Sequence, residues 1–150
     1  MNMLASVVSR LVDSDKLAQF ARRRNSSTLL LVDDDPIFCS VLKHALETRG
    51  FEIYIARDVK RSFELTEQVK FRYAVIDLSI GQESGLAVVK RLTESDANTR
   101  IVILTGYLTV ATAVQALKLG ADNYLTKPVD ADEIVAALHK QQGNAGGCSS

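Results

Sequence analysis

The feature that most constrains the fold is a regular alternation of short apolar runs with segments of helical periodicity. The first run, Thr28–Asp33, has no polar residue before its acidic end, as expected for a strand buried on both faces. The predicted strands are 28–33, 51–55, 73–77, 101–105 and 123–125, and the predicted helices run from Pro36 to Gly50, over 59–69, 85–92 and 110–119, and on from Asp130. Five such units predict an α/β domain with a single doubly wound parallel sheet and helices on both of its faces.

Residues typical of helix ends support these boundaries. Asp35-Pro36 places a capping carboxylate before a proline at the first helical position, where no backbone N–H is needed. Gly50 ends that helix, and Asp130 with Glu133 has the spacing of a capping box. The alternation therefore predicts one domain over residues 28–140.

The two ends of the chain have a different composition. Residues 1–27 combine apolar positions at helical spacing with the run Arg22–Arg24 and a polar stretch, which predicts an amphipathic helix and a linker. A solvated extension is the simpler interpretation, and a helix on a membrane surface or in a dimer contact is the alternative. Residues 141–150 are small and polar and are expected to be disordered.

Composition excludes several classes of protein. The formal net charge is zero, so no overall field attracts nucleic acid or acidic lipid. No apolar run approaches the roughly 18 residues that span a bilayer, and no signal peptide is evident. Cys39 and Cys148 lack metal-ligand spacing and are unsuited to a disulfide framework, so a reducing, cytoplasmic location is expected. His44 and His139 are expected to be ordinary surface or interface residues.

Polar groups collect where the predicted strands end. The first strand ends in Asp33-Asp34, the third in Asp77 and the fourth in Thr105, while the fifth leads into Lys127-Pro128. In a sheet of order 2-1-3-4-5, ligands bind at the carboxyl ends of the strands where the strand order reverses, between strands one and three. Each residue alone has a structural explanation, such as helix capping or a solvated turn. Their arrival at one edge predicts a functional site.

The chemistry of this group favours a divalent cation and phosphate. Three neighbouring carboxylates repel one another unless they are protonated or bound to a cation, and Mg²⁺ suits one or two carboxylates plus waters and phosphate oxygens. Asp77, at the end of the central strand, is best placed to attack phosphorus as a nucleophile. Lys127 and Mg²⁺ would spread the charge of the transferred group, and Thr105 would hydrogen-bond a phosphate oxygen.

The segments LLLVDDDP, YAVIDLSIGQESGL, IVILTGY and GADNYLTKPVDADEI resemble the response-regulator receiver domain of bacterial two-component systems. The resemblance covers about 29–138 and implies a flavodoxin-like, CheY-like fold. The family pattern has an acid pair, a phosphoacceptor Asp with a glycine eight residues later, a Thr or Ser, an aromatic residue and Lys-Pro. These features fall on Asp33-Asp34, Asp77 with Gly85, Thr105, Tyr124 and Lys127-Pro128.

The resemblance implies a role for each matching residue. Asp34, Asp77 and the backbone carbonyl of Ser79 would bind Mg²⁺ directly, and Asp33 would act through water. Asp77 would accept a phosphoryl group from a histidine of a sensor histidine kinase. Thr105 and Tyr124 would then move as switch residues and remodel the face formed by helix 4, strand 5 and helix 5. Such a protein is not an enzyme, but it assists its own phosphorylation and dephosphorylation.

The segments ILTGY, ATAVQALKLGA and YLTKPVDADE are more specifically similar to the RegA/PrrA/ActR group of redox-responsive regulators. Gly81 stands where many receivers have proline. Members of that group continue into a DNA-binding helix-turn-helix, and no recognition helix is evident after Gln142. The resemblance therefore implies either an isolated receiver or the regulatory domain of a transcriptional regulator whose DNA-binding domain is absent here, with phosphorylation-dependent homodimerisation as a further expectation.

Other functions remain as alternatives. A flavodoxin-like nucleotide or flavin binder would need a phosphate-cradling loop where Asp33–Asp35 stand, and these acids repel phosphate unless a metal intervenes. A hydrolase with an aspartyl nucleophile would need a further acid/base residue and a substrate cap, which the sequence does not clearly supply. A receiver that acts by protein interaction without phosphorylation is the main alternative. Ser79 and Tyr107 lie where the family tunes the lifetime of the phosphorylated state.

Overall fold

The computed structural model of the chain describes residues 27–106 and 110–140. Five parallel strands form one sheet in the order β2-β1-β3-β6-β7, which confirms the predicted topology once the strands are counted within that sheet. The elements in chain order are β1 (Thr28–Val32), α2 (Pro36–Glu47), β2 (Glu52–Ala56), α3 (Val59–Gln68), β3 (Tyr73–Asp77), β4 (Ser79–Ile80), β5 (Glu83–Ser84), α4 (Leu86–Ser95), β6 (Arg100–Thr105), α5 (Val110–Leu119), β7 (Asn123–Thr126) and α6 (Ala131–His139).

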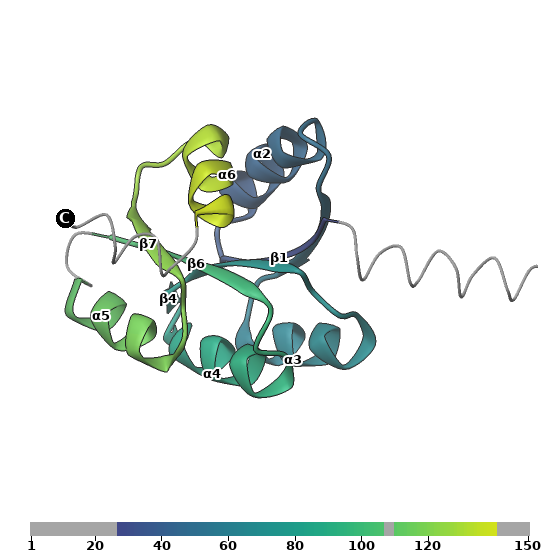
Figure 1. The fold of residues 1–150 in the computed structure, drawn as a ribbon. Helices are drawn as coiled ribbons and strands as arrows, with labels where there is room; N and C mark the ends of the chain where they lie inside the picture. Colours follow the sequence, from purple (N-terminus) through teal and green to yellow (C-terminus); the bar gives the residue numbers. More distant parts are fainter. Residues whose placement is uncertain (1–26, 107–109, 141–150) are drawn as a thin grey trace, which may run out of the picture.

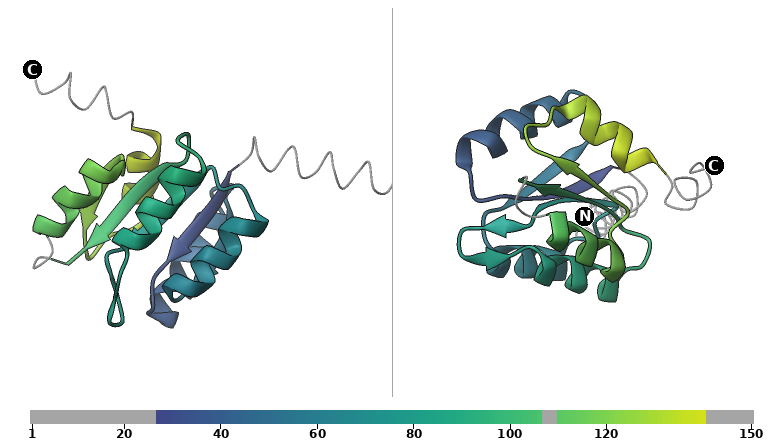
Figure 2. Two further views of the ribbon diagram at one scale, coloured as in Figure 1. Left: turned by 90° about the horizontal axis from the view of Figure 1, so that it is seen from below. Right: turned by 90° about the vertical axis from the view of Figure 1, so that its left-hand side faces the viewer.

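The helices form two layers, one on each face of the sheet (Figure 1). Helices α2 and α6 cover one face, and α3, α4 and α5 cover the other, as the two further views in Figure 2 also show. The strands are apolar throughout because both faces are covered. Along β1, Leu29 and Leu31 pack in the cluster under α2 and α6, whereas Leu30 and Val32 pack in the cluster under α3–α5. The uninterrupted apolar run thus reflects burial on both sides.

The helix caps are those that the sequence predicts. The Asp35 carboxylate accepts hydrogen bonds from the backbone N–H groups of Ile37 and Phe38, at 3.0 and 3.2 Å. Asp130 and Glu133 form a reciprocal capping box at the start of α6. Both caps follow strand ends, so they fix where the chain leaves the sheet and begins a helix.

One element was not predicted. Strands β4 and β5 pair antiparallel as a small hairpin between β3 and α4, with Ser79 opposite Ser84 and Ile80 opposite Glu83. In the left view of Figure 2, this narrow hairpin projects beyond the edge of the sheet. Two-residue strands carry no periodicity, so the apolar pattern could not reveal them. The hairpin lies directly after Asp77, and it therefore belongs to the surroundings of the predicted site.

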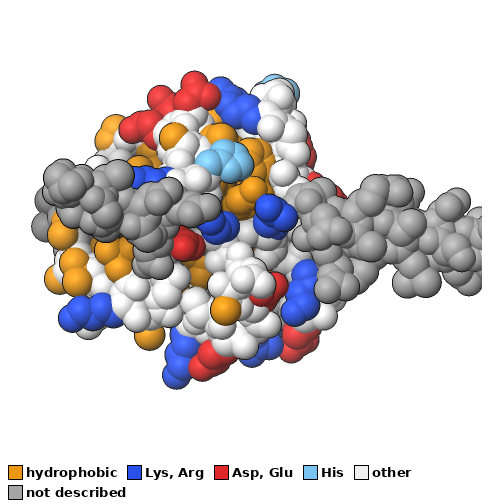
Figure 3. Space-filling view, in the orientation of Figure 1, with side chains coloured by type: hydrophobic (Ala, Val, Ile, Leu, Met, Phe, Trp, Pro, Cys, Tyr) orange, Lys and Arg blue, Asp and Glu red, His pale blue; other side chains and the backbone are white. Residues whose placement is uncertain are grey.

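Charged side chains of both signs lie on the surface of the domain. On the face seen in Figure 3, acidic and basic side chains are interspersed, in keeping with the zero net charge. Within residues 27–106 and 110–140, no helix is both long and apolar enough to cross a membrane. The predicted N-terminal amphipathic helix, the C-terminal tail and Tyr107 lie outside the described residues, so the proposed division of the chain stays a prediction.

Candidate functional site

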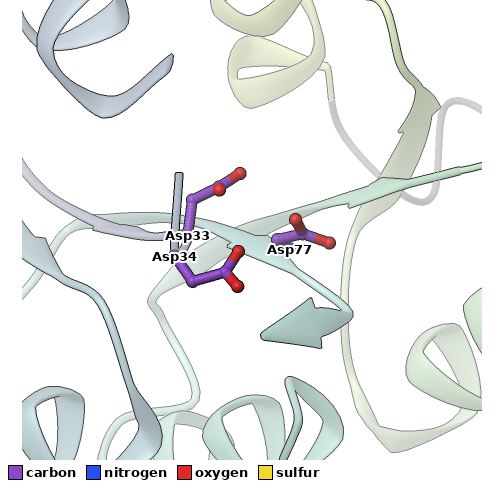
Figure 4. A group of neighbouring side chains, drawn as sticks. All are labelled: Asp33, Asp34 and Asp77. Atoms are coloured by element: carbon purple, nitrogen blue, oxygen red, sulfur yellow. The ribbon is translucent and has the colours of Figure 1, made fainter. Parts of the chain in front are cut away.

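Three acids meet at the carboxyl edge of the sheet (Figure 4). Strands β1 and β3 are direct neighbours, with Val32 opposite Ile76, so the residues that end them lie side by side. One carboxylate oxygen from each of Asp33, Asp34 and Asp77 lies within 4.8 Å of the others. The topology therefore brings together residues that stand more than forty positions apart in the sequence.

Lys127 reaches this group from the end of β7. Its Nζ atom donates hydrogen bonds to Asp33 Oδ2 at 2.7 Å and to Asp77 Oδ2 at 3.0 Å. Asp33 is fully buried and Asp77 is 8% exposed, whereas Asp34 is exposed. In a partly dry site these charge-assisted hydrogen bonds are much stronger than their equivalents at the surface.

Burial disfavours the charged form of the Asp77 carboxylate, and the single Lys127 ammonium offsets this only in part. Burial raises the pKa of Asp77, although hydrogen bonds from the Ser79 amide and from Lys127 act in the opposite direction. Burial also disfavours the charged form of Lys127, but its hydrogen bonds and attraction to Asp33 and Asp77 outweigh that cost and raise its pKa. A single ammonium thus serves two buried carboxylates, and the group keeps an excess of negative charge.

The position of Lys127 is fixed by contacts on both sides. Its backbone N–H donates to the carbonyl of Thr105 at 2.9 Å, in continuation of the β6–β7 pairing. Its ammonium lies 4.4 Å from the centre of the Phe38 ring, a cation–π contact across the sheet edge. Phe38 was not among the predicted site residues. Its position in the first turn of the helix that follows the acids could have indicated that it lies near the site.

Backbone amides of the hairpin segment complete the surroundings of the acids. The Ser79 N–H donates to Asp77 Oδ1, and the Gly81 N–H donates to Asp34 Oδ2, both at 2.9 Å. The prediction named the Ser79 carbonyl and treated Gly81 only as a departure from the family pattern. The amide donors were not foreseen, because nothing in a residue's type shows where its backbone N–H points.

Gly85 is required by close packing against the phosphoacceptor candidate. A Cβ atom at this position would lie 2.3 Å from the carbonyl oxygen of Asp77 and 2.9 Å from Cγ2 of Ile76. The glycine that the family pattern places eight residues after the acid therefore lets α4 begin directly against the end of β3.

The two predicted switch residues lie near the site, but within the described part of the chain their side chains make no hydrogen bond to its acids. Thr105 is fully buried at the end of β6, and its hydroxyl donates to the carbonyl of Gly106 at 2.8 Å. Tyr124, on β7, is half-buried and packs against the cluster under α3–α5. Their movement on phosphorylation therefore stays a prediction.

The cysteine and the two histidines of the described residues lie outside the acidic group. Cys39 is buried, its thiol donates to the Asp33 carbonyl at 3.2 Å, and burial together with the charge of Asp33 raises its pKa to about 11. His44 is exposed on α2. The His139 ring packs against Phe51 and Tyr73, with ring centres 6.4 and 5.9 Å apart. None of these side chains contributes a ligand to the acidic group.

The donor set fits a small, hard divalent cation. Asp33, Asp34 and Asp77 offer carboxylate oxygens, the ligand type that Mg²⁺ prefers, and they are too few to form a closed protein cage. A cation would also offset the repulsion among the acids and the cost of keeping Asp77 charged in a buried position. The site therefore combines three carboxylates that could hold a cation with one ammonium that is hydrogen-bonded to two of them.

Known proteins are similar to this chain in sequence and in fold. The profile of the response regulator receiver domain matches residues 29–139. The acid tolerance regulatory protein ActR of Sinorhizobium medicae is 46% identical over 116 residues, which make up 77% of this chain and 60% of ActR. The photosynthetic apparatus regulatory protein RegA of Rhodobacter capsulatus is 46% identical over 120 residues, or 80% of this chain and 65% of RegA. The chain thus spans less than two thirds of these relatives.

A crystal structure agrees with the sequence comparison. A response regulator protein from Burkholderia pseudomallei, described with a phosphorylated aspartic acid, a calcium ion and citrate, superimposes with a TM-score of 0.75 at 36% identity. The match covers 83% of this chain and 73% of that protein. Together with the family profile and the five-stranded sheet, these likenesses show that the chain belongs to the receiver domains of two-component response regulators, with RegA and ActR among its relatives.

Proposed function

We propose that the chain is a signalling switch in which Asp77 accepts a phosphoryl group from a phosphohistidine of a sensor histidine kinase. The observation that carries the proposal is the approach of three carboxylates to within 4.8 Å, with the Lys127 ammonium hydrogen-bonded to two of them. The relative from Burkholderia pseudomallei, described with a phosphorylated aspartic acid, supports the same chemistry. The protein would act stoichiometrically, as a phosphoacceptor that assists its own phosphorylation and dephosphorylation.

In the proposed reaction, an oxygen of the Asp77 carboxylate attacks phosphorus. The bond between phosphorus and the imidazole nitrogen breaks, the electron pair leaves with the imidazole, and the donor histidine takes up a proton from solvent. Lys127, already hydrogen-bonded to Asp77, would donate to an oxygen of the transferred group. Thr105 would turn its hydroxyl from the Gly106 carbonyl toward another phosphoryl oxygen, and Tyr124 would move inward behind it.

Mg²⁺ is the cofactor that we propose for this step. Asp34, Asp77 and the backbone carbonyl of Ser79 would hold it directly, and Asp33 would act through water. When bound, the cation would neutralise part of the negative charge on the phosphoryl oxygens. The Lys127 ammonium would meanwhile keep Asp33 and Asp77 oriented, which prepares the nucleophile for in-line attack.

Apolar side chains exposed on α5 suggest which face of the switch contacts a partner. Val110, Val114 and Leu119 of α5 are 44%, 43% and 41% exposed, and Figure 3 shows hydrophobic side chains gathered over this helix. We propose that phosphorylation remodels the α5–β7–α6 face and favours a homodimer there. We also propose a role in transcription together with a DNA-binding element, because a relative at 33% identity is described as the transcriptional regulatory protein ZraR of Escherichia coli.

The test is intact-mass spectrometry after incubation with acetyl phosphate and Mg²⁺. We expect the wild-type protein to gain one phosphoryl group, EDTA to abolish the gain, and Asp77→Asn to show none. If neither protein gains mass while both are folded and bind Mg²⁺, the domain acts by protein interaction without phosphorylation, which is the second candidate function.

A further inference from the structure

Three hydrogen bonds join the segment of the β4–β5 hairpin to the acids and to the start of α3. The Ser79 N–H binds Asp77 and the Gly81 N–H binds Asp34, as described above. The third attachment is farther from the acids: Glu83 Oε1 accepts a hydrogen bond from the Val59 N–H at 3.1 Å. The hairpin is therefore held between the carboxyl edge of the sheet and the start of α3.

The contact between Glu83 and Val59 satisfies a helix end from outside the helix. The first N–H groups of an α-helix have no partner within the helix. At α3, the Asp58 cap accepts from the Arg61 N–H at 2.7 Å, which leaves the Val59 N–H to another acceptor. Glu83 supplies this acceptor from a segment 24 positions away, and its charge is favourable at a helix N-terminus.

The contact between Gly81 and Asp34 orients a cation ligand. Asp34 is exposed, so packing does not select the direction of its side chain. Within the described part of the chain, the Gly81 N–H is the recorded hydrogen-bond donor to its carboxylate, and it engages Oδ2. A carboxylate held through one oxygen can offer the other to a cation without first losing rotational freedom.

We propose that Glu83 is a positioning residue of the cation site. By holding the hairpin on the start of α3, Glu83 keeps the Gly81 N–H where it orients Asp34, and it thereby sets the affinity of the site for Mg²⁺. The inference rests on the proposed function in taking Mg²⁺ as the ligand. It adds a residue that contacts none of the three acids through a recorded hydrogen bond, and it links cation binding to the first turn of α3.

The experiment measures Mg²⁺ affinity by isothermal titration calorimetry in four variants. Glu83→Ala removes the acceptor, and we expect a loss of about tenfold, the lower end of the range for residues that support metal ligands. Glu83→Gln keeps an acceptor oxygen without the charge and should bind nearly as the wild type does. Gln82→Ala, at the neighbouring exposed position, is the matched control and should change nothing.

Val59→Pro tests the same hydrogen bond from its other side. Proline has no N–H but is well tolerated at the first helical position, and Asp58 already has the extended backbone that a residue before proline prefers. This variant keeps the Glu83 charge, so a loss of affinity equal to that of Glu83→Ala identifies the hydrogen bond as the cause. Thermal melting of each variant shows whether the fold is retained.

Amide hydrogen exchange gives a second readout. Because coupling is reciprocal, Mg²⁺ should slow exchange of the Gly81 and Val59 amides in the wild type, and this protection should be lost in Glu83→Ala. The inference is overturned if Glu83→Ala and Val59→Pro bind Mg²⁺ as the wild type does, or if Glu83→Gln loses as much affinity as Glu83→Ala. A wild-type protein that binds no Mg²⁺ would instead overturn the proposed function itself.

Discussion

The two edges of the sheet bury polar groups in opposite ways. At the amino edge, the buried hydroxyls of Thr28 and Thr99 donate to the carbonyls of Lys70 and Phe71, at 3.0 and 2.9 Å. These groups are neutral, and each bond joins neighbouring segments of chain. At the carboxyl edge, buried carboxylates share a single ammonium and keep an excess of like charge.

This difference teaches how stability and function are divided in the molecule. A satisfied neutral group at the amino edge contributes to folding and leaves nothing to react. The gathered acids weaken the fold, and in the proposed function they would hold a cation and attack phosphorus. We therefore expect the removal of a buried polar group to lower stability at the amino edge and the neutralisation of a buried acid to raise it at the carboxyl edge.

The largest effect is expected where the carboxyl edge depends on close packing. Gly85→Ala should lower the free energy of unfolding by about 3–5 kcal/mol, because the new methyl group would overlap the Asp77 carbonyl and force β3 and α4 apart. Urea denaturation measures the loss. Gly106→Ala is the control, since a Cβ there meets no atom within 4 Å. Equal stability of the two variants would contradict the packing argument.

At the amino edge, removal of a hydroxyl should be costly. Thr99→Val keeps the shape of the side chain but leaves the Phe71 carbonyl without its donor, so the free energy of unfolding should fall by about 1–2 kcal/mol. Thr126→Val, at an exposed position of β7, should stay within about 0.5 kcal/mol of the wild type. If Thr99→Val lowers the free energy of unfolding less than Thr126→Val does, the buried hydroxyl at the amino edge does not stabilise the fold.

At the carboxyl edge, neutralising an acid should stabilise the protein. Without Mg²⁺, Asp77→Asn should raise the free energy of unfolding by about 1 kcal/mol at neutral pH, because burial disfavours the charged form of Asp77. The pKa of Asp77 is raised in the folded state, so protonation stabilises the wild type and the advantage of the variant should shrink as the pH falls. Chemical denaturation at several pH values measures this.

A control separates burial from charge in that experiment. Asp132→Asn removes an equal charge from an exposed side chain paired with Arg49, and it should change stability by less than about 0.5 kcal/mol. Added Mg²⁺ should stabilise the wild type more than Asp77→Asn, which reverses the order of the two proteins. If Asp77→Asn is less stable than the wild type without Mg²⁺, the charged Asp77 carboxylate does not destabilise the fold.

The smallest effect concerns reactivity rather than stability. Burial and the nearby Asp33 charge raise the pKa of the Cys39 thiol to about 11, so at pH 8 only about one thiol in a thousand is ionised. Iodoacetamide at pH 8 should therefore alkylate Cys39 far more slowly in the native protein than in guanidinium, as peptide mass mapping can show. Rapid native alkylation would mean that the thiol does not experience this environment.

The main sheet and most of the site could be predicted from sequence because both depend on local patterns. Apolar runs located the strands, and strand order brought Asp33, Asp34 and Asp77 together. The β4–β5 hairpin, Phe38 and Glu83 escaped because their roles depend on contacts between segments distant in the chain. The Thr105 hydroxyl donates to the Gly106 carbonyl in this structure, and its hydrogen bond to a phosphate oxygen, expected once phosphate is present, stays a prediction.

The distance along the chain between Asp33 and Lys127 has a consequence for biosynthesis. The two residues are 94 positions apart, so a ribosome delivers both acidic strands well before the lysine that bridges them. Until β7 joins the sheet, the nascent domain holds its carboxylates without their ammonium, and long-range pairing of this kind forms slowly. Under the proposed function, competence to accept a phosphoryl group would thus be complete only once β7 has joined the sheet.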